Sequence, residues 1–234
     1  MIVLGIDTST SQTSVALGSE QGTIAAAFLS TGQSHHEAVT PAVDHITRWS
    51  GTPLSHIGGV AVCIGPGLFT GLRVGIQTGK SIAQVLSVPM VALTSLDVLA
   101  FAVRYTRRVI CAAVDARRHE VFFALYRPAP GGVTRTTEYM VGTPATLAAE
   151  LEARAEDVLL VGDGAMRYRR ELESVGSHVD FASPALAYPN AAALVELSIP
   201  RFHREEFDRV ADVVPLYLRK SDAEIAWDKR ARTG

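Results

Sequence analysis

The sequence has few cysteines and almost no excess of charge. Its two cysteines, Cys63 and Cys111, each lie in an apolar run. We therefore expect buried thiols in the reducing cytoplasm, not a disulfide framework or a zinc site. The formal net charge is −2, and a protein that binds nucleic acid alone usually has a basic surface. Any role on RNA is accordingly expected to be indirect.

Long uninterrupted apolar segments are also missing. The first residues, MIVLGID, place no basic segment before their short apolar run, so we expect no signal peptide. Residues 64–88 have helical spacing, but Arg73, Gln77 and Lys80 interrupt them, which argues against a membrane span. With 47% hydrophobic and 20% charged residues, the composition is that of an ordinary globular protein.

Glycine, in contrast, is concentrated in one segment. Gly71, Gly75 and Gly79 recur at every fourth position of a helix predicted over residues 68–86, so they share one face. Each interior glycine costs about 1 kcal/mol of helix stability relative to alanine. Another backbone lying unusually close would compensate for this cost. That backbone belongs either to the chain's own sheet or to a docked protein, and the sequence leaves both alternatives open.

Hydrophobic periodicity predicts strands and helices in two successive halves. We expect strands near residues 2–6, 15–17, 22–30, 60–64, 88–93, 109–114, 121–126 and 158–161, and helices near 34–49, 68–86, 95–105, 143–154, 165–173 and 191–198. Pro41 either kinks or starts the helix over 34–49. Residues 213–219 are predicted to be extended, with a last helix over 221–230.

The two halves repeat one pattern. Asp7 and Asp115 each end an apolar strand, and a second strand follows each at the same offset. A later strand, a Gly-x-Gly turn and a helix also recur in the same order, which indicates duplication. This organisation predicts an α/β protein of the actin-like ATPase and sugar-kinase fold, with two duplicated subdomains at 1–105 and 106–234. Whether residues 200–234 pack back on the first half stays open.

Resemblance to that fold implies a nucleotide site between the halves. Its phosphates would contact two turns and its adenosine a third; the corresponding residues here are Asp7, Thr8, Ser9, Asp115, Arg117, Gly162, Asp163 and Gly164. The first turn has no glycine, the second carries bulky arginines, and the third has a carboxylate that disfavours phosphate. We therefore expect a degenerate site, weak nucleotide binding at most and no cofactor. The alternative is that both aspartates only bond the backbone of their own turns.

Four motifs name a family. GIDTS at 5–9, GPGLFTGLRVG at 65–75, VDARR at 114–118 and PLYLR at 215–219 together resemble the TsaB (YeaZ) family, nearly from end to end. The resemblance implies a non-catalytic partner of TsaD in forming threonylcarbamoyladenosine on tRNA, with TsaE in a larger complex. TsaD carries a His-x-x-x-His metal pair after the corresponding strand. Counted from Pro89, these positions hold Ser95 and Leu99, so we expect no metal site and no catalytic residue.

The resemblance also implies pairing through the helices at 34–49 and 68–86, either with TsaD or with a second copy of the chain. The expected contact residues are Val39, Val43, Ile46, Leu68, Gly71, Leu72, Arg73, Val74, Gly75, Gln77, Thr78, Gly79 and Ile82, with Arg73 at the rim. One alternative is an active actin-like ATPase or kinase, which would bind ATP with magnesium. A more remote alternative is a metalloprotease, for which the sequence shows neither a zinc motif nor a nucleophile motif.

Overall fold

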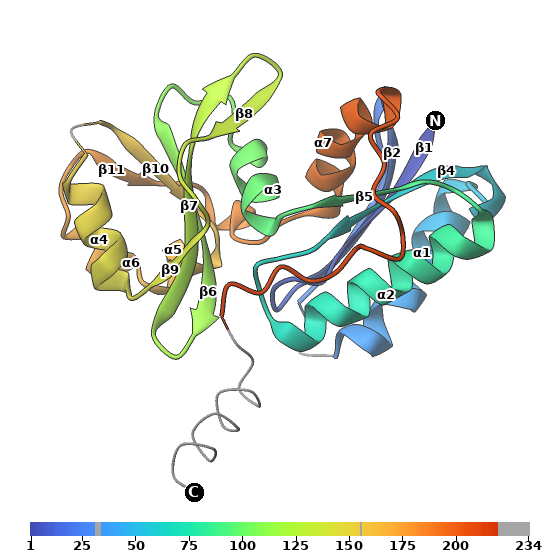
Figure 1. The fold of residues 1–234 in the computed structure, drawn as a ribbon, viewed down its shortest axis with the longest axis horizontal. Helices are drawn as coiled ribbons and strands as arrows, with labels where there is room; N and C mark the ends of the chain where they lie inside the picture. Colours follow the sequence, from blue (N-terminus) through green and yellow to red (C-terminus); the bar gives the residue numbers. More distant parts are fainter. Residues whose placement is uncertain (31–33, 155, 220–234) are drawn as a thin grey trace, which may run out of the picture.

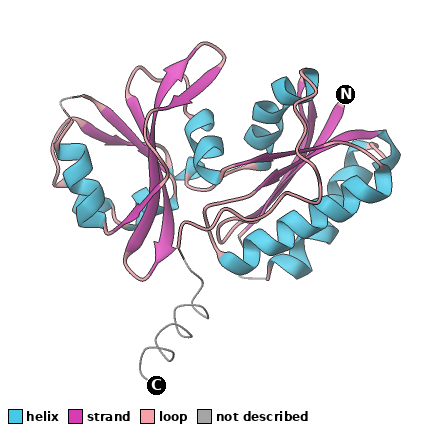
Figure 2. Ribbon diagram, in the orientation of Figure 1, coloured by secondary structure: helices cyan, strands magenta, loops and turns pink. Residues whose placement is uncertain are grey.

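The structure is a computed structural model that describes residues 1–30, 34–154 and 156–219. Two lobes, each built on one β-sheet, lie side by side (Figure 1). Helices cover both sheets, as the colouring by secondary structure shows (Figure 2). This is the α/β arrangement that the sequence predicts.

The first sheet contains five strands among the described residues, in the order β3-β2-β1-β4-β5. The strands are β1 (Ile2–Asp7), β2 (Thr13–Ser19), β3 (Gly22–Leu29), β4 (Ile57–Cys63) and β5 (Met90–Leu93). β1, β4 and β5 are parallel, whereas the hairpin strands β2 and β3 are antiparallel. Helices α1 (His35–Ser50) and α2 (Phe69–Leu86) lie together on one face, and the short 3-10 helix η1 (Leu54–His56) precedes β4.

The second sheet repeats this order as β8-β7-β6-β10-β11, with β9 pairing to β7. Its elements are β6 (Val109–Arg117), β7 (Glu120–Ala129), β8 (Gly132–Arg135), β9 (Met140–Gly142), α4 (Pro144–Glu152), β10 (Val158–Val161), α5 (Asp163–Arg167), α6 (Arg169–Glu173), β11 (Val179–Phe181) and the 3-10 helix η2 (Pro184–Leu186). In both lobes a hairpin is followed by two parallel strands. The common strand order shows that the two lobes are duplicates in topology.

The lobes exchange one helix each. Helix α3 (Ser95–Ala102) follows the first sheet but packs against strands of the second, whereas α7 (Ala191–His203) follows the second sheet and packs on β1 and β2. Residues 206–219, which we call the C-terminal strap, then run along the first lobe: the Asp208 amide donates to Met90 O at 2.9 Å and the Leu216 amide to Ile64 O at 2.8 Å. Because the chain already returns to the first lobe at Ala191, the predicted division at residues 105 and 106 does not follow the packing.

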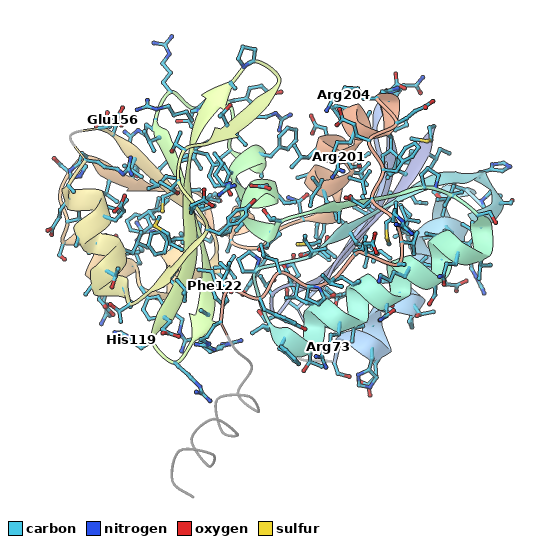
Figure 3. All side chains as sticks on the ribbon, viewed as in Figure 1. Arg73, His119, Phe122, Glu156, Arg201 and Arg204 are labelled. Carbon is cyan, nitrogen blue, oxygen red and sulfur yellow. The ribbon has the colours of Figure 1, made fainter. Side chains whose placement is uncertain are left out.

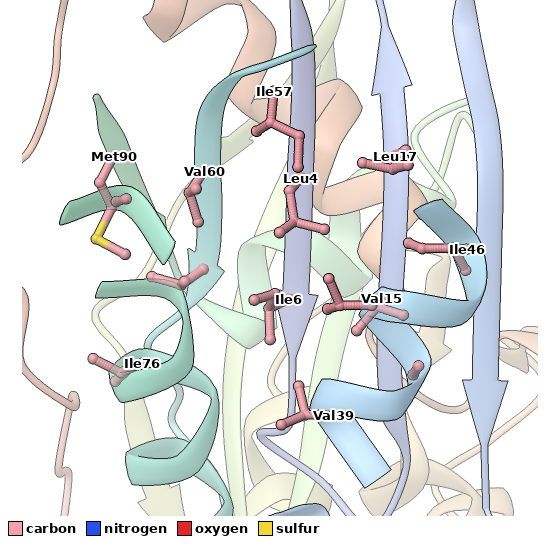
Figure 4. Packing of buried hydrophobic residues seen from close by; sticks show 14 of the residues in the cluster. Leu4, Ile6, Val15, Leu17, Val39, Ile46, Ile57, Val60, Ile76 and Met90 are labelled. Atoms are coloured by element: carbon pink, nitrogen blue, oxygen red, sulfur yellow. The ribbon is translucent and has the colours of Figure 1, made fainter. Parts of the chain in front are cut away.

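The core of the first lobe lies between its sheet and helices α1 and α2. Leu4, Ile6, Val39, Ile46 and Ile76 meet there (Figure 4), each at most 2% exposed. Both faces of β1 are covered, and this explains why its sequence is an uninterrupted apolar run. Because their buried residues pack against the first sheet, α1 and α2 each turn the opposite side toward solvent.

Several predicted boundaries differ from the structure. α1 begins at His35 and contains Pro41 as an interior residue, so Pro41 does not start the helix. Short strands β8, β9 and β11 carry too little periodicity to be predicted, and α7 continues through Pro200 to His203. The helix predicted over 221–230 and the end of the 200–234 segment lie outside the described residues. Across the described part of the chain, no helix combines the length and apolar character that crossing a membrane requires.

Candidate partner-binding face and inter-lobe site

The glycine face of α2 packs against the chain's own sheet. A Cβ atom built on Gly71 would lie 2.2 Å from the carbonyl oxygen of Thr8, and one on Gly75 would lie 2.3 Å from Thr8 Oγ1. At Gly79 the nearest atom is a Val62 methyl carbon, also at 2.3 Å. These distances are far below van der Waals contact, so each glycine is required by the close approach of the helix to β1 and β4.

This packing decides between the two alternatives for the glycine face. Gly71, Gly75 and Gly79 are buried inside the chain, so the prediction that they contact a partner is wrong. The prediction also fails for Val39, Ile46 and Leu72, which are at most 2% exposed in the lobe's core. A leucine at Gly75 would disturb the monomer itself and would not report on pairing.

The opposite side of α2 faces solvent and forms a groove with α1. The groove has a volume of about 540 Å³. Its lining comes from α1, η1 and α2, namely Thr40, Val43, Asp44, Thr47, Leu54, Gln77, Thr78, Ser81 and Ile82. Four of the predicted contact residues, Val43, Gln77, Thr78 and Ile82, therefore line one continuous surface.

Apolar side chains continue from this groove into solvent. Leu54 is 44% exposed, and Val85 is 82% exposed. Val85 follows Gln77 and Ser81 at four-residue spacing, so the three side chains share one face of α2. Val85 and Ser81 were not among the predicted contact residues, although their spacing from Gln77 could have identified them.

The remaining predicted contact residues lie elsewhere. Val74 is half-buried against the core of the first lobe. Leu68 precedes α2 and lines a small pocket of about 160 Å³ with the β6–β7 turn and the C-terminal strap. Arg73 is exposed and lies against Phe69 and Tyr217, one turn before the groove.

At the inter-lobe site, the first predicted phosphate turn is closed. Asp7, Thr8 and Ser9 are each at most 1% exposed. Thr8 Oγ1 donates to Gly71 O at 2.7 Å, and the Leu68 amide donates to Ser9 O at 2.7 Å. The entry to α2 thus uses the polar groups of this turn, and a phosphate group has no open access to them.

Asp7 is a buried carboxylate whose two oxygens differ. Oδ1 accepts a hydrogen bond from the Ser9 amide at 3.0 Å, whereas Oδ2 is buried without a hydrogen-bond partner in the described structure. Burial raises the pKa of Asp7 to about 6 because the charged form is poorly solvated. Asp7 therefore supports its own turn, which is the alternative that the sequence left open.

The second turn repeats this geometry in a more exposed setting. Asp115 Oδ1 accepts from the Arg117 amide at 3.0 Å, as Asp7 does from Ser9. Asp115 Oδ2 also pairs with Arg117 at 3.2 Å and with Arg167 at 3.5 Å. Both guanidinium groups are thus turned toward Asp115, and its carboxylate offsets one of their two positive charges, which weakens the attraction for a phosphate.

The third turn is held by packing rather than left open to a ligand. A Cβ atom on Gly162 would lie 2.0 Å from Ala113 O, and one on Gly164 would lie 2.9 Å from Val114 C. Asp163 Oδ1 accepts from the Asp115 amide at 3.0 Å, and burial raises the pKa of Asp163 to about 6. These glycines permit close contact with β6, which is a structural role.

Two of the pockets join the lobes at this place, because Asp115 and Arg117 line both the pocket of about 160 Å³ beside Leu68 and a further one. The further pocket has a volume of about 310 Å³, and its lining includes Ser11 from the first turn and Asp115, Arg117, Asp163 and Arg167 from the second lobe. Asp7, Thr8, Ser9, Gly162 and Gly164 are not part of that lining. The structure thus brings the predicted turns together but closes most of the predicted nucleotide contacts.

Comparison with known proteins identifies the family. The family model of TsaD, tRNA N6-adenosine threonylcarbamoyltransferase, matches residues 29–227. The chain belongs to the TsaD family. Within it, the chain falls among the TsaB (YeaZ) proteins. The tRNA threonylcarbamoyladenosine biosynthesis protein TsaB of Escherichia coli is 29% identical over 98% of this chain and 98% of the relative, and TsaB of Bacillus subtilis is 28% identical over 97% and 98%.

Solved structures agree with this placement. YeaZ from Pseudomonas aeruginosa superposes with a TM-score of 0.79 at 27% identity, covering 93% of this chain and 99% of that chain. More distant neighbours are the ethanolamine utilization protein EutJ, with a TM-score of 0.52 at 12% identity, and the activator of 2-hydroxyisocaproyl-CoA dehydratase from Clostridium difficile with bound ADPNP, with 0.51 at 11%. The last two share only the fold, which is the actin-like ATPase and sugar-kinase fold.

The metal that the TsaD family implies does not fit the residues present here. Ser95 is fully buried, and its Oγ donates to Pro66 O at 2.6 Å. Leu99 is 1% exposed and has no ligand atom. Elsewhere in the described ranges, no three His, Cys, Asp or Glu side chains gather as a metal ion would require. The two positions therefore supply no pair of metal ligands.

Proposed function

We propose that this chain is a non-catalytic partner subunit in the formation of threonylcarbamoyladenosine on tRNA, next to the anticodon. It docks on a catalytic TsaD protein through the groove between α1 and α2 and holds that protein in its active form. The observation that carries the proposal is the groove itself, with exposed Leu54 and Val85 beside it. A solvent-facing apolar surface of this kind is typical of a protein interface.

The inter-lobe geometry supports the proposal that this chain carries out no reaction of its own. Thr8 and Ser9 are buried, Asp115 is paired with two arginines, and the position of the first metal-binding histidine holds a buried serine. Substrate and metal would therefore be held by the partner. The names of the TsaB relatives, which refer to tRNA threonylcarbamoyladenosine biosynthesis, support the same assignment.

The groove also determines the order of assembly in this proposal. Two copies of the chain would pair through the same face, and docking on TsaD would displace the second copy because both use α1 and α2. TsaE would join the larger complex, and tRNA would contact the chain only indirectly. The complex would act in the cytoplasm and would need no cofactor bound to this chain.

Reconstitution tests the proposal directly. TsaD, TsaE, threonylcarbamoyl adenylate and unmodified tRNA are combined with and without this chain, and the modified nucleoside is measured by mass spectrometry. We expect modification to require the chain in a stoichiometric amount, whereas the chain alone modifies no tRNA. Equal modification in its absence would overturn the proposal.

The pocket of about 310 Å³ favours a second, weaker candidate, nucleotide binding by this chain. Arg117 and Arg167 could contact phosphate there, although both pair with Asp115. Calorimetry with ATP and magnesium separates the two functions. We expect at most weak binding and no hydrolysis, whereas an active ATPase or kinase requires tight binding and turnover by the isolated chain.

A further inference from the structure

Arg73 is an exposed arginine that contacts two aromatic side chains. Its Cζ lies 3.9 Å from the centroid of the Phe69 ring, and its Nε donates to Tyr217 Oη at 3.1 Å. No carboxylate in the described part of the chain forms an ion pair with it. A guanidinium has five N–H donors in a planar fork, and one of them is used here. The other four have no acceptor among the described residues, so they can bind one from outside this part of the chain.

Most exposed arginines among the described residues have an acidic partner nearby. Arg48, on the neighbouring helix α1, pairs with Asp44 at 2.8 Å. Arg127 pairs with Glu156 at 2.6 Å, and Arg169 pairs with Glu173 at 2.5 Å. Arg73 therefore differs from these arginines in charge balance, although it is equally accessible.

The C-terminal strap is what holds Arg73. The Leu216 amide donates to Ile64 O at 2.8 Å and fixes the strap beside the start of α2. Tyr217 then stacks on Phe69, with ring centroids 4.7 Å apart and an interplanar angle of 21°. Because the guanidinium is already held by the Phe69 ring and the Tyr217 hydroxyl, binding a carboxylate would cost little side-chain entropy.

Arg73 lies next to the groove that the proposed function uses. Gln77, which lines the groove, follows Arg73 by four residues and so shares its side of α2. Figure 3 shows Arg73 on this helix, on the side away from the first sheet. The groove and Arg73 thus form one continuous surface, apolar along α1 and α2 and positively charged at its N-terminal edge.

We propose that Arg73 is a preformed binding site for a carboxylate of the TsaD protein that docks in the groove. The recognised group is an Asp or Glu side chain, bound through the free edge of the guanidinium. Tyr217 is a positioning residue, since it acts through Arg73. This inference rests on the proposed function, because it assumes that the groove is the docking face.

The test is the dissociation constant of the complex with TsaD, measured by calorimetry at low and high salt. Arg73→Ala should weaken binding roughly 30-fold, as loss of an interface hot spot does, and should reduce the salt dependence. Arg73→Lys keeps the charge but loses the planar fork, so we expect about a tenfold loss. Tyr217→Phe keeps the stacking and removes the acceptor, so the loss should be about threefold. Arg127→Ala, the matched control, removes an exposed arginine of β7 that is not part of the groove lining, and it should leave the constant within about twofold.

A double variant separates positioning from direct contact. If Tyr217 acts only through Arg73, then Tyr217→Phe should add nothing in an Arg73→Ala background. Thermal melting checks that each variant is folded. If Arg73→Ala does not fold, the affinity of Arg73→Lys for TsaD takes its place in the test. Wild-type affinity in Arg73→Ala, with binding lost in Val85→Glu, would refute this inference and leave the docking face intact. Wild-type affinity in both variants would refute the docking face itself.

Discussion

The two sides of α2 have opposite relations to the rest of the molecule. On the inner side, glycines at 71, 75 and 79 let the helix approach β1 and β4 until Cβ atoms would collide with Thr8 and Val62. On the outer side, Gln77 and Ser81 line an open groove and Val85 is 82% exposed. A stripe of small residues can permit close packing on the chain's own sheet as well as on a partner protein. The difference between the two sides teaches that residue size alone does not show which side of a helix is open to a partner.

The largest expected effect is a loss of stability when the packing of the inner side is disturbed. Gly71→Ala places a methyl group 2.2 Å from a backbone carbonyl oxygen, which cannot rotate away as a side chain could. We expect the free energy of unfolding, measured by urea titration, to fall by about 3 kcal/mol, although alanine gains about 1 kcal/mol in helix propensity.

The matched control for this variant is Gly132→Ala. Gly132 has no atom within 4 Å of the added Cβ atom, so its stability should change by less than about 0.5 kcal/mol. A Gly71→Ala protein as stable as the wild type would show that the inner side has room to spare.

A pH dependence of intermediate size should come from Asp7, in the turn that the inner side covers. Its pKa is about 6 in the folded chain, against 3.8 as the ordinary value, so the folded state binds the proton more tightly. Its contribution to stability is therefore complete below the ordinary pKa and is lost as the pH rises through about 6. Between pH 4.5 and pH 7 the free energy of unfolding should fall by about 2 kcal/mol from this group.

Asp7→Asn isolates that contribution. Asparagine keeps an oxygen acceptor for the Ser9 amide but does not titrate, and Asp163, whose pKa is raised in the same direction, remains in both proteins. The difference in unfolding free energy between variant and wild type should therefore change with pH by the amount expected for Asp7. Parallel pH profiles for the two proteins would contradict the assignment.

The smallest expected effect concerns the outer side. Val85→Glu replaces a side chain that is 82% exposed, and its carboxylate would stay in water. The free energy of unfolding should change by less than about 0.5 kcal/mol. A larger loss in urea titration would mean that Val85 supports the fold, and the contrast between the two sides of α2 would then be weaker.

Much of the fold followed from local patterns in the sequence. The apolar run of β1 and the spacing of α1 and α2 identified their elements to within one or two residues. The repeated Asp-turn motif predicted the duplication, and the structure shows its cause: Asp7 and Asp115 each accept a hydrogen bond from the amide two residues later.

The neighbours of the predicted contact residues in the folded chain could not be predicted from local patterns. The spacing of Gly71 and Gly75 shows that they share a side of the helix, but the neighbour of that side is set by long-range packing against Thr8. Likewise, Tyr217 and Arg73 are 144 residues apart, and no local pattern links them. The exchange of α3 and α7 between the lobes also depends on tertiary contacts that composition does not encode.

The most direct test of the docking face compares two glutamate variants at exposed valines. Val85 lies on the outer side of α2, and Val214, which is 62% exposed, lies on the C-terminal strap. Each folded variant is mixed with TsaD, and complex formation is followed by size-exclusion chromatography and calorimetry. We expect Val85→Glu to weaken the complex at least 100-fold, about 2.8 kcal/mol, while Val214→Glu binds as the wild type does. Wild-type binding by Val85→Glu would contradict the docking face.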